Sequence, residues 1–132
     1  TVVNRYEDVK ALAAAGKLDA ARSGLRKLLR SDPKNGFYHL QLGNLSFERG
    51  AWSSGLSSYR SAIRYRRKYR SYATVNRNAI RALGSNKTRW AAQSLITRSL
   101  GRAAVPYLRR AAASDKSSLV RKRAAQVLKK IR

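Results

Sequence analysis

The stretch HLQLGNLSFERGAWSSGLSSYRSAI, residues 39–63, decides the fold class of this chain. Leucine and aromatic residues recur in it three and four positions apart, which is the spacing of an amphipathic α-helix. Gly50 interrupts the pattern with a residue that suits a tight turn, and the helical spacing resumes after it. The stretch therefore predicts two helices that are joined at Gly50.

This hairpin has a counterpart earlier in the chain. Gly16 precedes Gly50 by 34 residues, and the same interval separates Leu25 from Tyr59. A fixed period of this length indicates helical repeats, each of which buries its apolar face against the next. Pro33 falls between the two units, where it begins the second.

The N-terminal half resembles tetratricopeptide repeats over about residues 2–65. The second unit carries the resemblance at Leu42-Gly43, Gly50, Gly55, Tyr59 and Ala62, and the first at Gly16, Ala21, Leu25 and Asp32-Pro33. In this interpretation Gly43 lets two helices approach closely and Gly50 supplies the turn. The second unit has Arg67 where the family usually has proline, so the helix predicted over 52–70 either runs on or bends after Ile63.

The C-terminal half has an internal echo of its own, because AAQSL at 91–95 recurs as AAQVL at 124–128, 33 residues later. Residues 100–131 resemble a HEAT repeat, and a degenerate unit precedes it, so that this resemblance covers about 75–131. It rests on Ala104-Val105-Pro106 and Leu108 in a first helix, Asp115 in the turn, and Val120-Arg121 and Ala124-Ala125 in a second.

The expected fold is therefore all-α. Two tetratricopeptide-like hairpins over 1–70 and HEAT-like hairpins over 71–132 are expected to continue one α-solenoid with a concave surface. The sequence predicts about eight helices in antiparallel pairs, at 3–15, 18–30, 36–49, 52–70, 72–83, 87–99, 102–113 and 117–131.

Charge is the second decisive feature. The chain has 30 Lys and Arg against 6 Asp and Glu in 132 residues, a formal net charge of +24. Residues 1–48 carry a net +3, whereas residues 49–132 carry 22 cations and one acid, a net +21. Self-repulsion of this size destabilises a compact state, so it indicates an anionic partner.

The segment YRSAIRYRRKYRSY, residues 59–72, concentrates this charge. On a helical wheel Arg60, Arg64, Arg67 and Lys68 form a stripe beside the apolar face. Two interpretations of the tyrosines stay open: Tyr65, Tyr69 and Tyr72 either pack against the next helix or stack on nucleobases. Cations in the last helix are expected on its outer side.

We therefore expect a non-enzymatic module that binds nucleic acid through its phosphates with little sequence preference, since no base-reading motif is present. Arginine outnumbers lysine 20 to 10 and suits two-point contact with phosphate. The candidate binding residues are Arg60, Arg64, Tyr65, Arg66, Arg67, Lys68, Tyr69, Arg70, Arg98, Arg102, Arg109, Arg110, Arg121, Lys122, Arg123, Lys129 and Lys130.

A protein-interaction module that binds an acidic peptide or domain is the alternative that the repeat resemblance by itself implies. A membrane partner is disfavoured because no helix pairs a basic face with a large exposed apolar face. The chain starts at Thr1, so we expect a piece of a longer protein with neighbouring domains, located in the cytoplasm, nucleoid or nucleus. The choice between DNA and RNA stays open.

No catalytic, metal or cofactor motif is present. His39 is expected to pack, Asp19 and Asp32 to cap helices or turns, and Asp115 to cap the last helix. One enzymatic alternative is a DNA glycosylase, which some HEAT-like proteins are, with Asp115 and Trp90 beside the damaged base.

Overall fold

The structure is a computed structural model that describes residues 2–131. Helices are the only regular secondary structure in these residues, with no strand among them, which confirms the all-α class. Two compact units follow each other along the chain, with Arg67 as the last residue of unit 1 and Lys68 as the first of unit 2.

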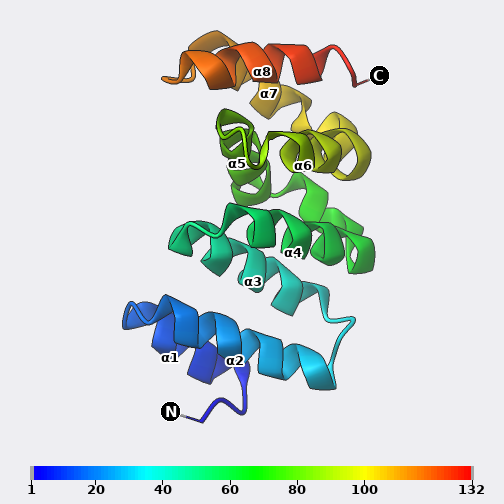
Figure 1. The fold of residues 1–132 in the computed structure, drawn as a ribbon. Helices are drawn as coiled ribbons and strands as arrows, with labels where there is room; N and C mark the ends of the chain where they lie inside the picture. Colours follow the sequence, from blue (N-terminus) through cyan, green and yellow to red (C-terminus); the bar gives the residue numbers. More distant parts are fainter. Residues whose placement is uncertain (1, 132) are drawn as a thin grey trace. The chain divides into compact units, whose positions relative to one another are not determined.

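Unit 1 consists of helices in which each packs against the next one in sequence (Figure 1). They are α1 (Tyr6–Ala14), α2 (Leu18–Ser31), α3 (Gly36–Arg49) and α4 (Trp52–Tyr65). The side chains of Val9 on α1 and Leu25 on α2 are fully buried in the core of this unit. Burying a residue of this size contributes about 1.5–3 kcal/mol, so packing rather than local propensity stabilises these short helices.

The hairpin of α3 and α4 closes where two glycines face each other. A Cβ atom on Gly43 would lie 2.5 Å from the Tyr59 ring and 3.3 Å from the Gly55 carbonyl oxygen. A Cβ atom on Gly55 would lie 2.5 Å from the Phe47 ring. The two rings stack with centroids 5.5 Å apart. Close helix approach at Gly43 is thereby confirmed, and larger residues at either glycine would force the hairpin apart.

The turns of unit 1 also follow the expected chemistry. Gly50 ends α3 with φ +88°, a conformation that side chains with a Cβ rarely adopt. Asn35 caps α3, because its Oδ1 accepts the Tyr38 N–H at 3.0 Å, while its Nδ2 donates to the Asp32 carboxylate at 2.9 Å. Asp32 is therefore a turn residue, as its position after α2 indicates.

The helix predicted over 52–70 is wrong beyond residue 65. Helix α4 ends at Tyr65, Arg66 is extended at φ −150° and ψ 95°, and a short 3₁₀-helix η1 (Arg67–Ser71) follows. A straight continuation would carry Arg66 and Arg70 over the apolar side of the helix, where an unpaired charge is costly. The break leaves both residues exposed.

In unit 2, α-helices alternate with short 3₁₀-helices and one π-helix among the described residues. Its elements after η1 are α5 (Ala73–Arg81), 3₁₀-helix η2 (Ala82–Gly84), α6 (Arg89–Ser94), π-helix η3 (Leu95–Leu100), 3₁₀-helix η4 (Gly101–Ala104), α7 (Val105–Ser114) and α8 (Ser118–Leu128). Helix α7 packs along α8, and α5 contacts both of them (Figure 1). Leu83, Ile96, Leu100 and Leu108 are enclosed in the core of this unit.

The regular helix predicted over 87–99 is also wrong in its second half. Six residues from Leu95 form a π-helix, and Gly101 then turns the chain with φ +54° and ψ −134°. The Thr97 hydroxyl donates to the Gln93 carbonyl at 2.9 Å and so satisfies one backbone acceptor at this change of helix type. Apolar spacing cannot separate a short π-helix from an α-helix, because both bury residues three to five apart.

Ser117, rather than Asp115, is the N-cap of α8. The Ser117 hydroxyl accepts the Val120 N–H at 3.2 Å. Asp115 lies at the end of α7, where its Oδ1 accepts the Ser117 N–H at 2.9 Å. Asp115 therefore shapes the turn between the two helices, which corrects the expectation that it caps the last one.

Candidate nucleic-acid interface

The cations of segment 59–72 are all exposed to solvent. Arg60 and Arg64 project from α4, Arg66 follows it, and three more lie on η1, namely Arg67, Lys68 and Arg70. The change from α-helix to extended chain to 3₁₀-helix replaces the single stripe expected on one helix. A basic segment is present at this position, but its cations lie on three differently folded stretches of chain rather than on one helix.

The tyrosines of this segment divide into two kinds. Tyr65 is 40% exposed, and its ring stacks on His39 with centroids 5.6 Å apart. The His39 Nε2–H donates to the Pro33 carbonyl at 2.8 Å, so the histidine has a packing and turn-holding role. Tyr65 thus offers a partly open ring beside Arg64 and Arg66.

Tyr69 corrects the predicted site, because it is only 4% exposed. It contacts Tyr72 edge to face at 5.0 Å and belongs to the interior of unit 2. The 3₁₀-helix turns residue 69 inward, whereas a straight helix would have placed it on the Tyr65 side. Tyr69 is unavailable for stacking on a nucleobase in this conformation.

A buried asparagine fixes the end of the basic segment within unit 2. Asn76 is fully buried on α5, and its Nδ2 donates to the carbonyl oxygens of Arg70 and Tyr72, at 2.9 Å each. Its Oδ1 has no hydrogen-bond partner. The two bonds fix the end of η1, and therefore the positions of Lys68 and Arg70. The only indication of these two hydrogen bonds in the sequence is a polar residue on an otherwise apolar helix face.

Arg123 is the second correction, because it is buried rather than outward-facing. Its exposure is 8%, and its two terminal nitrogens donate to the Leu83 carbonyl and the Asn86 Oδ1, at 2.6 Å each. Burial lowers the pKa of Arg123, and the neighbouring charge of Arg89 lowers it further. Residue 123 lies three positions after Val120, near the apolar side of the helix, but this spacing does not indicate that an arginine there finds hydrogen-bond partners.

The remaining candidate cations lie on several elements of unit 2. Arg121 is half-buried and donates to the Asp115 carbonyl, which makes it a turn residue in part. Lys122, Lys129 and Lys130 are exposed on and just after α8. The others are exposed as well: Arg98 on η3, Arg102 on η4, and Arg109 and Arg110 on α7.

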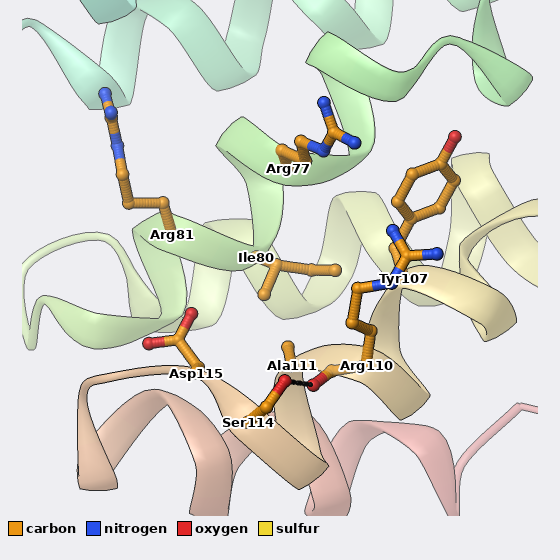
Figure 2. Close-up of a pocket in the computed structure, with 8 residues that line it drawn as sticks. All are labelled: Arg77, Ile80, Arg81, Tyr107, Arg110, Ala111, Ser114 and Asp115. Atoms are coloured by element: carbon orange, nitrogen blue, oxygen red, sulfur yellow. Dashed lines mark hydrogen bonds between the residues drawn. The ribbon is translucent and has the colours of Figure 1, made fainter.

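A cavity of about 300 Å³ in unit 2 gathers cations that the sequence did not bring together. Its lining comes from α5 and from α7 with the turn after it, namely Arg77, Ile80, Arg81, Tyr107, Arg110, Ala111, Ser114 and Asp115. Figure 2 shows Arg77 and Arg110 reaching from the two helices toward the side where Tyr107 lies. Among the described residues, neither guanidinium has a hydrogen-bond or ion-pair partner. Two uncompensated guanidinium groups on one cavity favour an anionic ligand.

Among these lining residues, Arg110 was predicted from the sequence to contact phosphate, and Asp115 was placed beside a base only in the glycosylase alternative. Arg77, Arg81 and Tyr107 were missed. Arg77 and Arg81 are four residues apart and therefore share one side of a helix, a signal that was visible in the sequence. Their meeting with Tyr107 and Arg110 depends on the packing of α5 against α7, which no spacing along the chain indicates.

The acids do little to offset charge in unit 2. In unit 1, Asp19 pairs with Arg22 at 3.4 Å and with Arg49 at 3.0 Å, both in exposed positions. Asp19 thus links α2 to α3 and is not a cap. Unit 2 has 17 cations and Asp115 as its single acid, a net +16. No described lysine or arginine forms an ion pair with the Asp115 carboxylate.

Asp115 and Trp90, the two residues of the glycosylase alternative, do not share a cavity. Trp90 is 63% exposed on α6 with the Arg89 guanidinium 4.4 Å from its ring, and it does not line the cavity that contains Asp115. Residues 2–131 hold no cluster of three or more His, Cys, Asp or Glu with a geometry for metal binding. In the same range, every helix is too short or too polar to cross a membrane.

Comparisons with protein-family models, curated proteins and solved structures found no match. The function is therefore inferred from the geometry and charge of the chain itself.

Proposed function

We propose that this protein is a helical-repeat module that binds nucleic acid by its phosphate backbone. Unit 2 presents exposed cations on several of its helices, and the exposed arginines of segment 59–72 are further candidate contacts. The binding is electrostatic and largely independent of sequence, because the cations are distributed over several helices rather than placed on one recognition helix.

One observation carries the proposal. Of the described cations in unit 2, thirteen are exposed, and none of the described cations forms an ion pair with the single acid of that unit. A solvated surface normally mixes both signs of charge. Here the positive field stays uncancelled, which favours accumulation of a polyanion and release of its condensed counterions on binding.

The architecture supports the same proposal at the level of its repeats. Unit 1 has the glycine contact and the turn glycine expected of tetratricopeptide hairpins, and unit 2 pairs α7 with α8 as a HEAT repeat would. We propose that the units are helical repeats of these two kinds. Continuity of one superhelix through both stays a prediction.

Salt dependence tests the proposal. The protein is titrated with a random-sequence duplex and with a single strand at low and at moderate salt. A site with six to ten phosphate contacts should lose roughly 10³–10⁵ in affinity between about 50 and 200 mM salt. Weak binding at both concentrations would overturn the proposal.

A matched pair of charge variants locates the surface. Changing Arg64, Arg67 and Lys68 together to glutamine should lower the salt slope by roughly 0.9 for each duplex phosphate that these side chains no longer neutralise. The control changes three exposed cations of α2 to glutamine, namely Arg26, Lys27 and Arg30. Equal effects of the two triple variants would show that only net charge matters and that segment 59–72 is not part of the interface.

The alternative function is binding of an acidic peptide or protein domain. It uses the same exposed cations, and the repeat resemblance favours it. A polyglutamate peptide that bound as tightly as the single strand at equal salt, with the same variants weakening it, would support this alternative.

A further inference from the structure

The cavity between α5 and α7 differs from the rest of the basic surface because its lining includes a carboxylate and an apolar middle. Figure 2 shows Arg110 and Tyr107 on one side, Asp115 and Arg81 on the opposite side, and Ile80 with Ala111 between them. A phosphate backbone running over a surface would need only the cationic end. The carboxylate and the apolar middle are features that a backbone contact does not explain.

The cationic end is built to hold one anionic group. Arg77 comes from α5, whereas Arg110 and Tyr107 are one helical turn apart on α7. Guanidinium groups contact phosphate oxygens at two points each, and a tyrosine hydroxyl can donate a further hydrogen bond. With neither arginine paired inside the protein, an incoming phosphate displaces water and no internal partner.

The Asp115 carboxylate provides hydrogen-bond acceptors on the other side of the cavity. Asp115 Oδ1 already accepts the Ser117 N–H at 2.9 Å, which holds the carboxylate in place. Oδ2 has no hydrogen-bond partner among the described residues. A fixed carboxylate oxygen that lines a cavity accepts from an N–H group and repels a carbonyl oxygen.

The middle of the cavity is apolar and small. Ile80 is 4% exposed and Ala111 is half-buried, so they form a floor that a flat ring can cover. A volume of about 300 Å³ is at the lower limit of small-molecule sites, and it suits one planar group with its substituents.

We propose that this cavity binds one nucleotide of a single strand, with its phosphate at Arg77 and Arg110 and its base on the Ile80–Ala111 floor. Asp115 accepts a hydrogen bond from the exocyclic amino group of the base and so favours cytosine over thymine. This inference rests on the proposed nucleic-acid binding and adds to it a preference at one base position. Proteins that read single strands commonly hold an unstacked base in this way.

The test compares two flexible pyrimidine strands. Affinities of the whole protein for oligo(dC) and oligo(dT) of equal length are measured at one salt concentration. Cytosine offers an amino donor where thymine offers a carbonyl acceptor, so a single charge-assisted hydrogen bond should favour oligo(dC) by roughly tenfold or more.

The variant Asp115→Asn makes the test specific. Asparagine keeps an oxygen for the Ser117 N–H but presents an amide N–H₂ to the base, which matches thymine O4. The preference should therefore vanish or reverse. Methyl resonances of Ile80 and Ala111 should shift on titration with oligo(dC).

Charge variants separate this proposal from the general one. Arg77→Gln with Arg110→Gln should weaken both strands and remove the methyl shifts. Lys122→Gln with Lys130→Gln removes the same charge elsewhere on unit 2 and should leave the oligo(dC) preference intact.

Tight, salt-sensitive binding with equal affinity for the two strands, unchanged by Asp115→Asn, would overturn the nucleotide site and leave the proposed function standing. Absence of binding to any strand would overturn both. Methyl shifts caused by an acidic peptide, and not by oligo(dC), would assign the cavity to a protein ligand and refute the nucleotide site.

Discussion

Replacing Gly43 with alanine should destabilise unit 1, although alanine is the better helix former. A Cβ atom at this position would lie 2.5 Å and 2.6 Å from two carbons of the Tyr59 ring, where ordinary contact begins at 3.4 Å. The ring cannot retreat easily, because it is fully buried, stacks on Phe47, and donates its hydroxyl hydrogen to Asn44 Oδ1 at 2.6 Å.

The expected magnitude follows from two opposing effects. Overpacking a rigid core costs about 1–3 kcal/mol, and here the overlap of nearly 1 Å favours the upper end. Helix propensity returns about 1 kcal/mol. The net loss is about 2 kcal/mol of unfolding free energy, or roughly 8–16 °C in Tm if unit 1 unfolds as a domain of its own size.

Urea unfolding followed by circular dichroism at fixed pH measures this loss. Ser57→Ala, on the exposed side of α4, is the control for helix propensity and should stabilise by no more than about 0.7 kcal/mol. Tyr59→Leu should relieve the clash, so that the double variant with Gly43→Ala loses about 1 kcal/mol less than the sum of the single losses. A Gly43→Ala protein as stable as the wild type would refute the close approach of α3 and α4.

Three further variants test single interactions. Asn76→Ala removes the hydrogen bonds to the Arg70 and Tyr72 carbonyl oxygens and should cost about 1–3 kcal/mol in urea unfolding of unit 2; an unchanged stability would contradict their importance. Arg123→Met should lower the unfolding midpoint but keep the affinity of the folded protein for a single strand within about twofold, since a buried arginine contacts no phosphate; a large loss of affinity would contradict its structural role. Hydrogen bonds from the N–H groups of Asn4 and Arg5 lower the pKa of Asp8, so the stability that this carboxylate adds is complete above its unfolded pKa of about 3.9 and is lost as the pH falls through the folded value. Unfolding midpoints measured through this acid range should therefore depend on pH less steeply in Asp8→Asn, and identical curves would contradict the assignment.

The order and type of most helices could be predicted from the sequence, because local spacing carries that information. Residues 39–63 place Gly43 and Tyr59 on the facing sides of two helices, and Gly50 between them in a turn that requires a positive φ. The exposure of the cations in segment 59–72 could also be predicted, because charged side chains are seldom buried in a protein core. The helical class and the excess of positive charge are thus properties of the amino-acid sequence by itself.

Only the tertiary structure decided which of the candidate side chains are buried and which cations lie close together. Tyr69 turns inward because the chain breaks at Arg66, and Arg123 turns inward because η2 offers it the Leu83 carbonyl. The cavity exists because α5 packs against α7 and brings Arg77 near Arg110, 33 positions along the chain. Hydrophobic spacing specifies which face of a helix is buried, but it does not specify which other helix covers that face. Contacts between residues distant in sequence are set by that second choice.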